Sequence, residues 1–236
     1  MKLKNPPIIE SVCEFRFDNN LKPITLLYET IKEYVVSQDM VIEKQVDVLA
    51  ANDGNDDKVS TKKNEYPRFV LNENKTMFVV VKNNVVSIHR KKIGDYPDWE
   101  NFCPIVKKVY NFFTKEHIQI TRFGFRNVNI LKTNKKKEEV SFSDYFNFNI
   151  SNALWKDNQI KSFTYGVILE EKTGFARIQF ADLLKKGDEN VEFLFDMDFF
   201  TTENTLDFDE WLYDVHESSL EKLRRVIKDG VLEYYD

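Results

Sequence analysis

The sequence predicts an α+β protein built from two similar β-α-β(n)-α halves. These would form a mostly antiparallel, curved sheet with helices on one face, in a saddle-like or helix-grip-like arrangement. The pair Phe15-Arg16 recurs as Phe125-Arg126, 110 residues later. Trp99 and Trp211 each open an acidic and aromatic helical segment, and they lie 112 residues apart. Short apolar segments with tight turns between them follow in each half, as in an antiparallel meander.

The composition indicates a globular protein. Hydrophobic residues make up 42% of the 236 residues and aromatic residues 14%, which is enough for a substantial core. The formal net charge of −5 disfavours nucleic acid and anionic membrane surfaces as partners. The chain shows neither a secretory signal at its start nor a run approaching the roughly 20 apolar residues of a membrane span. We therefore expect a cytoplasmic protein without membrane contact.

Few residues are available for redox or metal chemistry. The two cysteines, Cys13 and Cys103, are too few for a disulfide framework and lack the paired spacing of a zinc site. The three histidines, His89, His117 and His216, are far apart in sequence. Phosphate-binding glycine loops, nucleophile elbows and His-Glu-x-x-His helices do not occur in the sequence. We therefore predict no metal and no cofactor, and no enzyme class is indicated.

The first half begins with a strand over residues 12–18, in which apolar and charged residues alternate. A helix follows over residues 23–35 with Pro23 in its first turn, and a polar loop is expected over 52–57. Strands are predicted over 68–72, 77–82 and 85–91. Asp98 is a plausible N-cap for the helix that starts near Trp99, although Pro104 favours a start nearer Asn101.

The second half repeats this order with different loops. A strand over 118–131 precedes a charged loop over 133–139 and a segment over 142–148 in which the helix is short or absent. Strands are predicted over 162–170, 175–180 and 191–201. The last helix covers about 207–228 and is expected to end near Asp229-Gly230.

The two halves, residues 1–117 and 118–236, are expected to form one continuous structural unit. The connection between Phe113 and Ile120 is too short for independent domains. This order of elements is similar to that of a TATA-binding-protein-like saddle, a fold analogy that carries no functional weight by itself.

Several short segments resemble a sporadically distributed bacterial protein family with no assigned function. The resemblance rests on the segments NPPIIESVCEFRF at residues 5–17, WENF at 99–102, RFGFRNVN at 122–129, FDMDF at 195–199 and DVHE at 214–217. It brings no catalytic residues. The patchy distribution of that family implies a role in an accessory, mobile-element or phage-defence system.

Charged residues on three predicted strands are the candidate site. Strand alternation places Arg122 and Arg126 on one face with Gly124 between them, and places Asp196 and Asp198 on one face of the strand over 191–201. Arg16 shares the corresponding face of the first strand with Glu14. In one interpretation these side chains are cross-strand ion pairs on a solvated face.

Three ligand interpretations compete with that one. In the first, the two arginine forks bind a phosphate or carboxylate in the space above Gly124. In the second, Asp196 and Asp198 hold a metal ion for hydrolysis together with His216 or Glu217. In the third, the basic runs at residues 89–92 and 135–137 touch a phosphate backbone, which the net charge disfavours.

The sequence therefore favours a non-enzymatic interaction or regulatory module that binds a protein partner or itself. The alternative is a small-anion or nucleotide binder, or a hydrolase, that uses Arg122, Arg126, Asp196 and Asp198, with Arg16 as a further candidate ligand. These two hypotheses differ in whether the charged side chains pair with each other or converge on a ligand.

Overall fold

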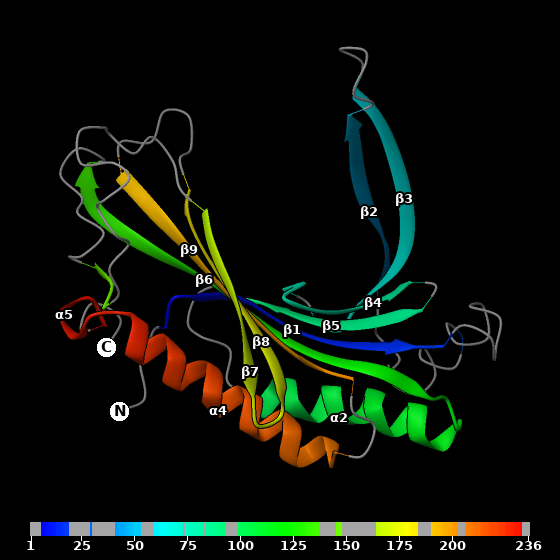
Figure 1. The fold of residues 1–236 in the computed structure, drawn as a ribbon. Coiled ribbons are helices and arrows are strands. Elements are labelled where there is room, and N and C mark those ends of the chain that lie inside the picture. Colours follow the sequence, from blue (N-terminus) through cyan, green and yellow to red (C-terminus); the bar gives the residue numbers. More distant parts are fainter. Residues whose placement is uncertain are drawn as a thin grey trace. The chain divides into compact units, whose positions relative to one another are not determined.

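The computed structural model describes residues 6–18, 29, 41–52, 59–72, 74–82, 84–92, 99–136, 145–147, 164–183, 190–202 and 206–232. Within these residues, nine strands form a mostly antiparallel sheet and are accompanied by the helices α2, α4 and α5 (Figure 1). The predicted α+β class is confirmed. The predicted helix over 23–35, most of the loop over 52–57 and the N-cap Asp98 lie outside the described residues.

The chain divides into two compact units that interleave in sequence. We name each after its long helix. The α2 unit comprises Cys13–Arg90 and Trp99–Thr121, and the α4 unit comprises Met1–Val12, Lys91–Asp98 and Arg122–Asp236. The strand β1 (Ile8–Phe17) contributes its first residues to the α4 unit and its remaining residues to the α2 unit.

In the α2 unit, the strands are hydrogen-bonded in the order β2 (Val41–Asn52), β3 (Val59–Val70), β4 (Met77–Lys82) and β5 (Val85–Lys91). The second part of β1 follows β5, and the Phe17 amide donates to the Asn84 carbonyl at 3.1 Å. The strands β2 and β3 pair over twelve residues, from Val41 opposite Val70 to Asn52 opposite Val59. The strand predicted over 68–72 therefore begins earlier, at Val59, because β2 supplies hydrogen-bond partners along its whole length.

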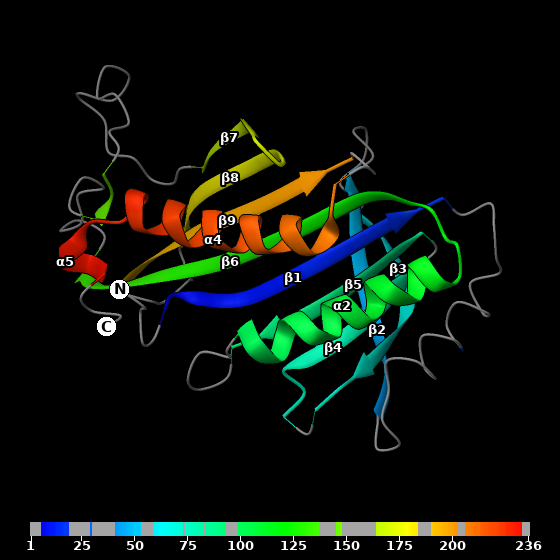
Figure 2. The same ribbon diagram turned by 90° about the horizontal axis from the view of Figure 1, so that it is seen from below.

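The helix α2 (Trp99–Lys115) begins at Trp99 although Pro104 lies inside it. Its apolar stripe faces the sheet of its own unit, and the Phe113 ring lies 5.6 Å from that of Phe15 and 5.3 Å from that of Phe17. Figure 2 shows α2 running along β5. Burial of this stripe compensates for the helical hydrogen bond that proline cannot donate.

In the α4 unit, the first part of β1 lies beside β6 (Ile120–Lys136), and the Ile130 amide donates to the Pro7 carbonyl at 2.9 Å. The order continues through β9 (Asn190–Thr201) and β8 (Gly174–Leu183) to β7 (Thr164–Glu171). The predicted loop over 133–139 was wrong for its first residues. The strand β6 continues to Lys136, which lies opposite Asn190 after an irregularity in the register. The pairing of Lys136 with Asn190, the first residue of β9, thus extends β6 into residues that look like a loop in sequence.

The helix α4 (Phe208–Val226) lies along the face of β6 and β9, as Figures 1 and 2 show. Asp207 caps its first turn, and the Asp207 carboxylate accepts hydrogen bonds from the amides of Asp209 and Glu210. The expected end near Gly230 was wrong. The helix ends at Val226 because Ile227 is extended and pairs with Phe146 in an isolated bridge, and Gly230 belongs to the short helix α5 (Asp229–Leu232).

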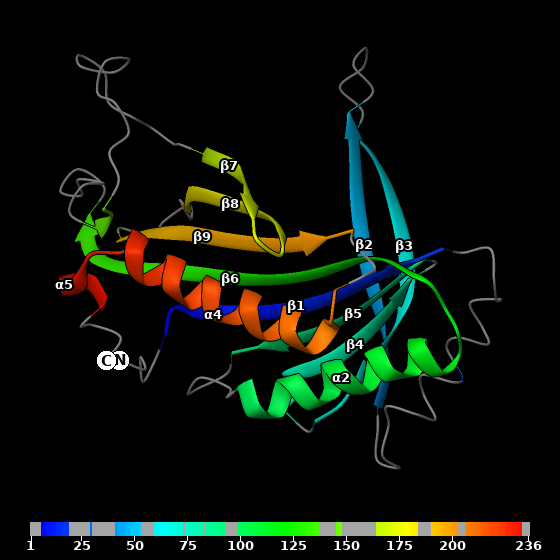
Figure 3. The same ribbon diagram turned by 60° about the horizontal axis from the view of Figure 1, so that its bottom comes forward.

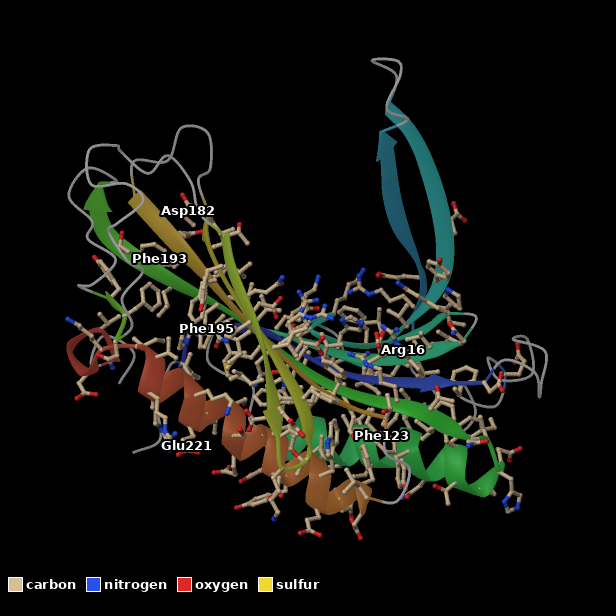
Figure 4. The ribbon with its side chains drawn as sticks, viewed as in Figure 1. Arg16, Phe123, Asp182, Phe193, Phe195 and Glu221 are labelled. Atoms are coloured by element: carbon tan, nitrogen blue, oxygen red, sulfur yellow. The ribbon has the colours of Figure 1, made fainter. Side chains whose placement is uncertain are left out.

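The core of the α4 unit lies between its sheet and α4. The Phe123 ring on β6 packs 5.2 Å from Phe208 and 5.7 Å from Trp211, and Figure 4 shows it on the helix side. On β9, Phe195 stacks on Phe180 with the ring centroids 4.5 Å apart, next to Phe193, and both β9 residues are labelled in Figure 4. In the part of the chain that the structure describes, no helix combines the length and apolar character needed to cross a membrane.

Candidate functional site

The open face of the α4 unit carries four of the five predicted site residues. On β6, Phe123 and Phe125 point toward α4, so that Arg122 and Arg126 lie on the opposite face. On β9, the buried Phe195, Met197 and Phe199 leave Asp196 and Asp198 on that same open face. The structure therefore brings these four charged side chains together.

Arg126 and Asp196 form the best-defined pair on this face. The Arg126 Nε atom donates to Asp196 Oδ1 at 2.8 Å and its Nη2 atom donates to Asp196 Oδ2 at 2.6 Å. The Asp196 side chain is only 6% exposed, whereas that of Arg126 is 50% exposed. The hydrogen bonds to Asp196 raise the pKa of Arg126, with smaller contributions from the charges of Asp198 and Glu10. One edge of the guanidinium, formed by Nε and Nη2, is thus engaged within the protein, and the Nη1 atom takes no part in this pair.

Arg122 is held between a carboxylate and an aromatic ring. Its Nη2 atom donates to Asp198 Oδ2 at 3.5 Å, and its guanidinium carbon lies 4.7 Å from the centre of the Phe200 ring. Gly124 lies directly opposite Phe200 in the register of β6 and β9 and is itself buried. The absence of a side chain at Gly124 therefore does not open a space to solvent.

Arg177 on β8 is a further member of this face that the sequence reasoning did not single out. It lies directly opposite Asp198 in the register of β8 and β9. Its side chain is exposed, and among the described residues it has no hydrogen bond or ion pair. Two signals for it were present in the sequence, namely the alternation of Arg177 with Ala176 and Ile178 and the antiparallel meander expected for the second half, which places the strand over 175–180 beside the strand over 191–201.

Arg16 belongs to the α2 unit. Its Nε atom donates to Glu14 Oε1 at 2.7 Å, and its side chain is 49% exposed. Figure 4 shows Arg16 on the side of β1 that faces away from α2. The predicted strand face is thus correct for Arg16, and its observed partner is its neighbour Glu14.

His216 lies on the other side of the sheet from the aspartates. It is on α4, and its ring approaches that of Phe125 edge to face at 6.4 Å. Burial lowers the pKa of His216, although the neighbouring Glu217 carboxylate, 3.3 Å away, opposes this shift. Since His216 faces the core, it cannot join Asp196 and Asp198 around one ion. No group of three or more histidine, cysteine, aspartate or glutamate side chains suited to a metal occurs in the described residues.

Next to His216, a buried polar network links the sheet to α4. The Asn127 amide nitrogen donates to Ser219 Oγ at 2.8 Å, and the Asn127 side-chain oxygen accepts from Ser11 Oγ at 2.6 Å. The Ser219 hydroxyl in turn donates to the His216 carbonyl at 2.8 Å. These bonds satisfy polar groups that would otherwise be costly to bury, so the network positions α4 on β6.

The hairpin of β7 and β8 presents apolar side chains to solvent. The exposed fractions are 61% for Ile168, 44% for Tyr165, 43% for Phe175 and 40% for Leu169. Figure 3 shows the turn of this hairpin directed toward α4, where Trp211 Nε1 donates to the Thr173 carbonyl at 3.0 Å. The hairpin is therefore anchored to the helix at its turn, while its strand surface stays apolar and accessible.

Comparison of the chain with protein-family models and with curated proteins gave no match.

Proposed function

We propose that this protein is a non-enzymatic interaction module that binds a protein partner or a second copy of itself through the β7–β8 hairpin. One observation carries this proposal. Four of the seven large apolar side chains that are exposed in the described residues lie on this one hairpin, namely Tyr165, Ile168, Leu169 and Phe175. Apolar side chains gathered on one exposed element are typical of an interaction surface, whereas scattered ones need no explanation.

The pairing of the charged residues supports a non-enzymatic role. Arg126 is bound through Nε and Nη2 to Asp196, and Arg122 is bound through Nη2 to Asp198. An anionic ligand on this face would lie beside the carboxylates of Asp196 and Asp198, which already neutralise the charge of the two arginines. The open face is therefore better suited to holding strands in register than to chemistry.

The resemblance of the motifs to a patchily distributed bacterial family supports a place in an accessory system, such as phage defence or a mobile element. We also propose that the two sequence halves, residues 1–117 and 118–236, arose by duplication in a saddle-like fold. The first strand of each sequence half places two aromatic residues toward the long helix of its own unit, Phe15 and Phe17 toward α2 and Phe123 and Phe125 toward α4. Superposition of the two halves in an experimental structure tests this shared origin.

Quantitative affinity purification from the native host tests the proposed function. The tagged wild-type chain is compared with Ile168→Asp, which places a charge in the apolar hairpin, and with Tyr213→Asp, a control on α4 whose side chain is 60% exposed. We expect at least one protein, including an untagged copy of the chain, to be recovered with wild type and with the control but to be lost with Ile168→Asp. Identical recovery for all three chains would contradict the proposal.

A small-anion site is the second candidate function, and the exposed Arg177 is the observation that favours it. A guanidinium opposite Asp198 that lacks a partner among the described residues is available to a phosphate or carboxylate. Titration with inorganic phosphate, followed by calorimetry, separates the candidates. Saturable binding that Arg177→Ala removes would favour the anion site, whereas the interaction-module proposal predicts no saturable binding.

A further inference from the structure

Among the described residues, the first six residues of β7, Thr164 to Leu169, have little of the protection that is usual for an edge strand, whereas its last two residues, Glu170 and Glu171, are charged. It is the last strand in the hydrogen-bonding order of the α4 unit, and no strand of the described residues pairs with its outer edge. It stays in unbroken register with β8 from Thr164 to Glu171, without a bulge. Its sequence TYGVILEE contains no proline, lysine or arginine. Natural sheets usually place bulges, prolines or charged side chains, lysine above all, on an exposed edge strand, where they prevent unwanted pairing.

The apolar side chains of β7 lie on both faces of the strand. Tyr165, Val167 and Leu169 pair with the buried β8 residues Phe180, Ile178 and Ala176, so these three lie on the helix side. Ile168 pairs with Arg177 and therefore lies on the open face. An additional strand along β7 would cover apolar surface on both sides at once.

The sequence of β7 is complementary to itself in one antiparallel register. With a two-fold axis through Val167, Tyr165 lies opposite the partner's Leu169, and Ile168 lies opposite the partner's Gly166. Gly166 leaves room for this isoleucine, because it has no side chain of its own. Glu170 then lies opposite the partner's Thr164, so that the acidic end of one strand meets the uncharged end of the other.

Parallel pairing of the same strands is less favourable. It would place Glu170 and Glu171 beside the same residues of the second copy, and like charges in direct cross-strand contact are destabilising. A closed two-fold pairing also uses the same edge of both copies and leaves no further β7 edge exposed. The charge pattern of the strand therefore selects the antiparallel arrangement.

We propose that a second copy of this chain pairs antiparallel with β7 about a two-fold axis through Val167, which forms a homodimer with a sheet continuous across the two copies. This inference rests on the proposed interaction function of the β7–β8 hairpin and identifies the partner that binds there as a second copy of the chain.

Sedimentation equilibrium of the purified full-length chain tests the dimer. The mass should rise with concentration from the 28.0 kDa of one chain toward twice that value. Ile168→Asp should weaken the dimer by about tenfold or more, because it buries a charge against an apolar strand. Tyr213→Asp should leave the dissociation constant unchanged. A wild-type chain that stays at the mass of one copy up to millimolar concentration would overturn the inference.

The position of the two-fold axis is tested with engineered cysteines. Val167→Cys faces its own counterpart across the axis, within the reach of a disulfide. Ile168→Cys is the matched control. Residue 168 lies opposite residue 166 of the second copy, so the two cysteines at position 168 would be roughly 8 Å apart, beyond the reach of a disulfide. After mild oxidation with diamide, covalent dimer should form with Val167→Cys and stay at the wild-type level with Ile168→Cys, both in the presence of the native Cys13 and Cys103. Equal yields from the two variants would contradict this register.

The outcomes separate this inference from the function on which it rests. A chain that is monomeric, but that loses a different protein from its native host when Ile168 is replaced by aspartate, would overturn the homodimer and keep the interaction module. A chain that is monomeric and loses no protein on that substitution would overturn both.

Discussion

At the residue scale, Gly174 occupies a position whose backbone conformation and surroundings require glycine. Its φ angle is +128°, and a Cβ atom placed there would lie 2.4 Å from the Phe200 carbonyl oxygen and 2.9 Å from the Thr201 Cβ atom. Both the left-handed conformation and the close approach to β9 require glycine. The first residue of β8 therefore fixes how the hairpin lies against β9.

Replacing Gly174 with alanine should destabilise the protein by about 2–4 kcal/mol, since backbone strain and a steric clash add together. Gly166→Ala, in the same hairpin, is the control, because its added Cβ would meet only ordinary contacts, the nearest 3.6 Å away. Urea denaturation measures both variants. A change below 0.5 kcal/mol for Gly174→Ala, on the order of ordinary surface substitutions, would contradict the observed hairpin geometry.

The Arg126–Asp196 pair should contribute measurably to stability, because Asp196 is buried and depends on Arg126 for its hydrogen bonds. Arg126→Ala should destabilise the chain by about 1–3 kcal/mol, less than for a fully buried pair since Arg126 is half exposed. Arg16→Ala, which removes an exposed pair, should change stability by less than about 0.5 kcal/mol. A double-mutant cycle between Arg126 and Asp196 isolates the pair, and a coupling energy near zero would show that the pair is incidental.

His216 should make stability depend on pH. Because burial lowers its pKa in the folded protein, the unfolded chain binds the proton more readily. Stability should therefore be unaffected by His216 well above the unfolded pKa of about 6.5 and should fall as the pH drops below it. Urea denaturation between pH 7.5 and 5.5 measures this slope. His216→Gln should reduce the dependence of the unfolding free energy on pH. An unchanged dependence would mean that other titratable groups cause it.

At the scale of elements, the start of α4 depends on one capping side chain. Asp207→Ala should destabilise the protein by about 1 kcal/mol, since two amides of the first turn lose their acceptor. Asp207→Asn keeps an acceptor oxygen and should lose much less. Thermal unfolding distinguishes the two variants, and equal losses would mean that charge at the helix end matters more than the hydrogen bonds.

The elements that the sequence predicted well are those with strong periodicity. The stripe from Phe208 to Leu223 identified α4, and alternation in β1, β6 and β9 assigned the faces of Arg16, Arg126 and Asp196 correctly. Charged segments were harder to predict, because residues 133–136 of β6 look like a loop in sequence although Lys136 pairs with Asn190 of β9. The end of α4 at Val226 was also hidden, since it depends on the bridge between Ile227 and Phe146.

The sequence predicted which residues belong to the candidate site, but it did not predict that the strands β6 and β9 lie side by side and bring them together. Alternation could place Arg126 and Asp196 on open strand faces, but only strand order shows that β6 and β9 are neighbours. The exposure of Ile168 was equally impossible to predict from the sequence. An apolar segment such as residues 165–169 looks like a core strand in sequence, and only its place at the end of the strand order leaves it uncovered.

At the scale of the whole molecule, two surfaces of the α4 unit differ in character, one charged and internally paired and the other apolar and exposed. The paired arginines and aspartates join β6 and β9 on the open face, and the apolar β7–β8 hairpin is the proposed binding surface. Substitutions on the two surfaces should therefore have separable consequences, one for stability and one for association.

The most direct test compares Arg126→Ala and Ile168→Asp in one sedimentation experiment on the folded chain, at a temperature at which both variants remain native by circular dichroism. We expect that Arg126→Ala associates as the wild type does, and that Ile168→Asp stays at the mass of one chain. Loss of association in Arg126→Ala together with normal association in Ile168→Asp would place the functional surface on the charged face and contradict the account.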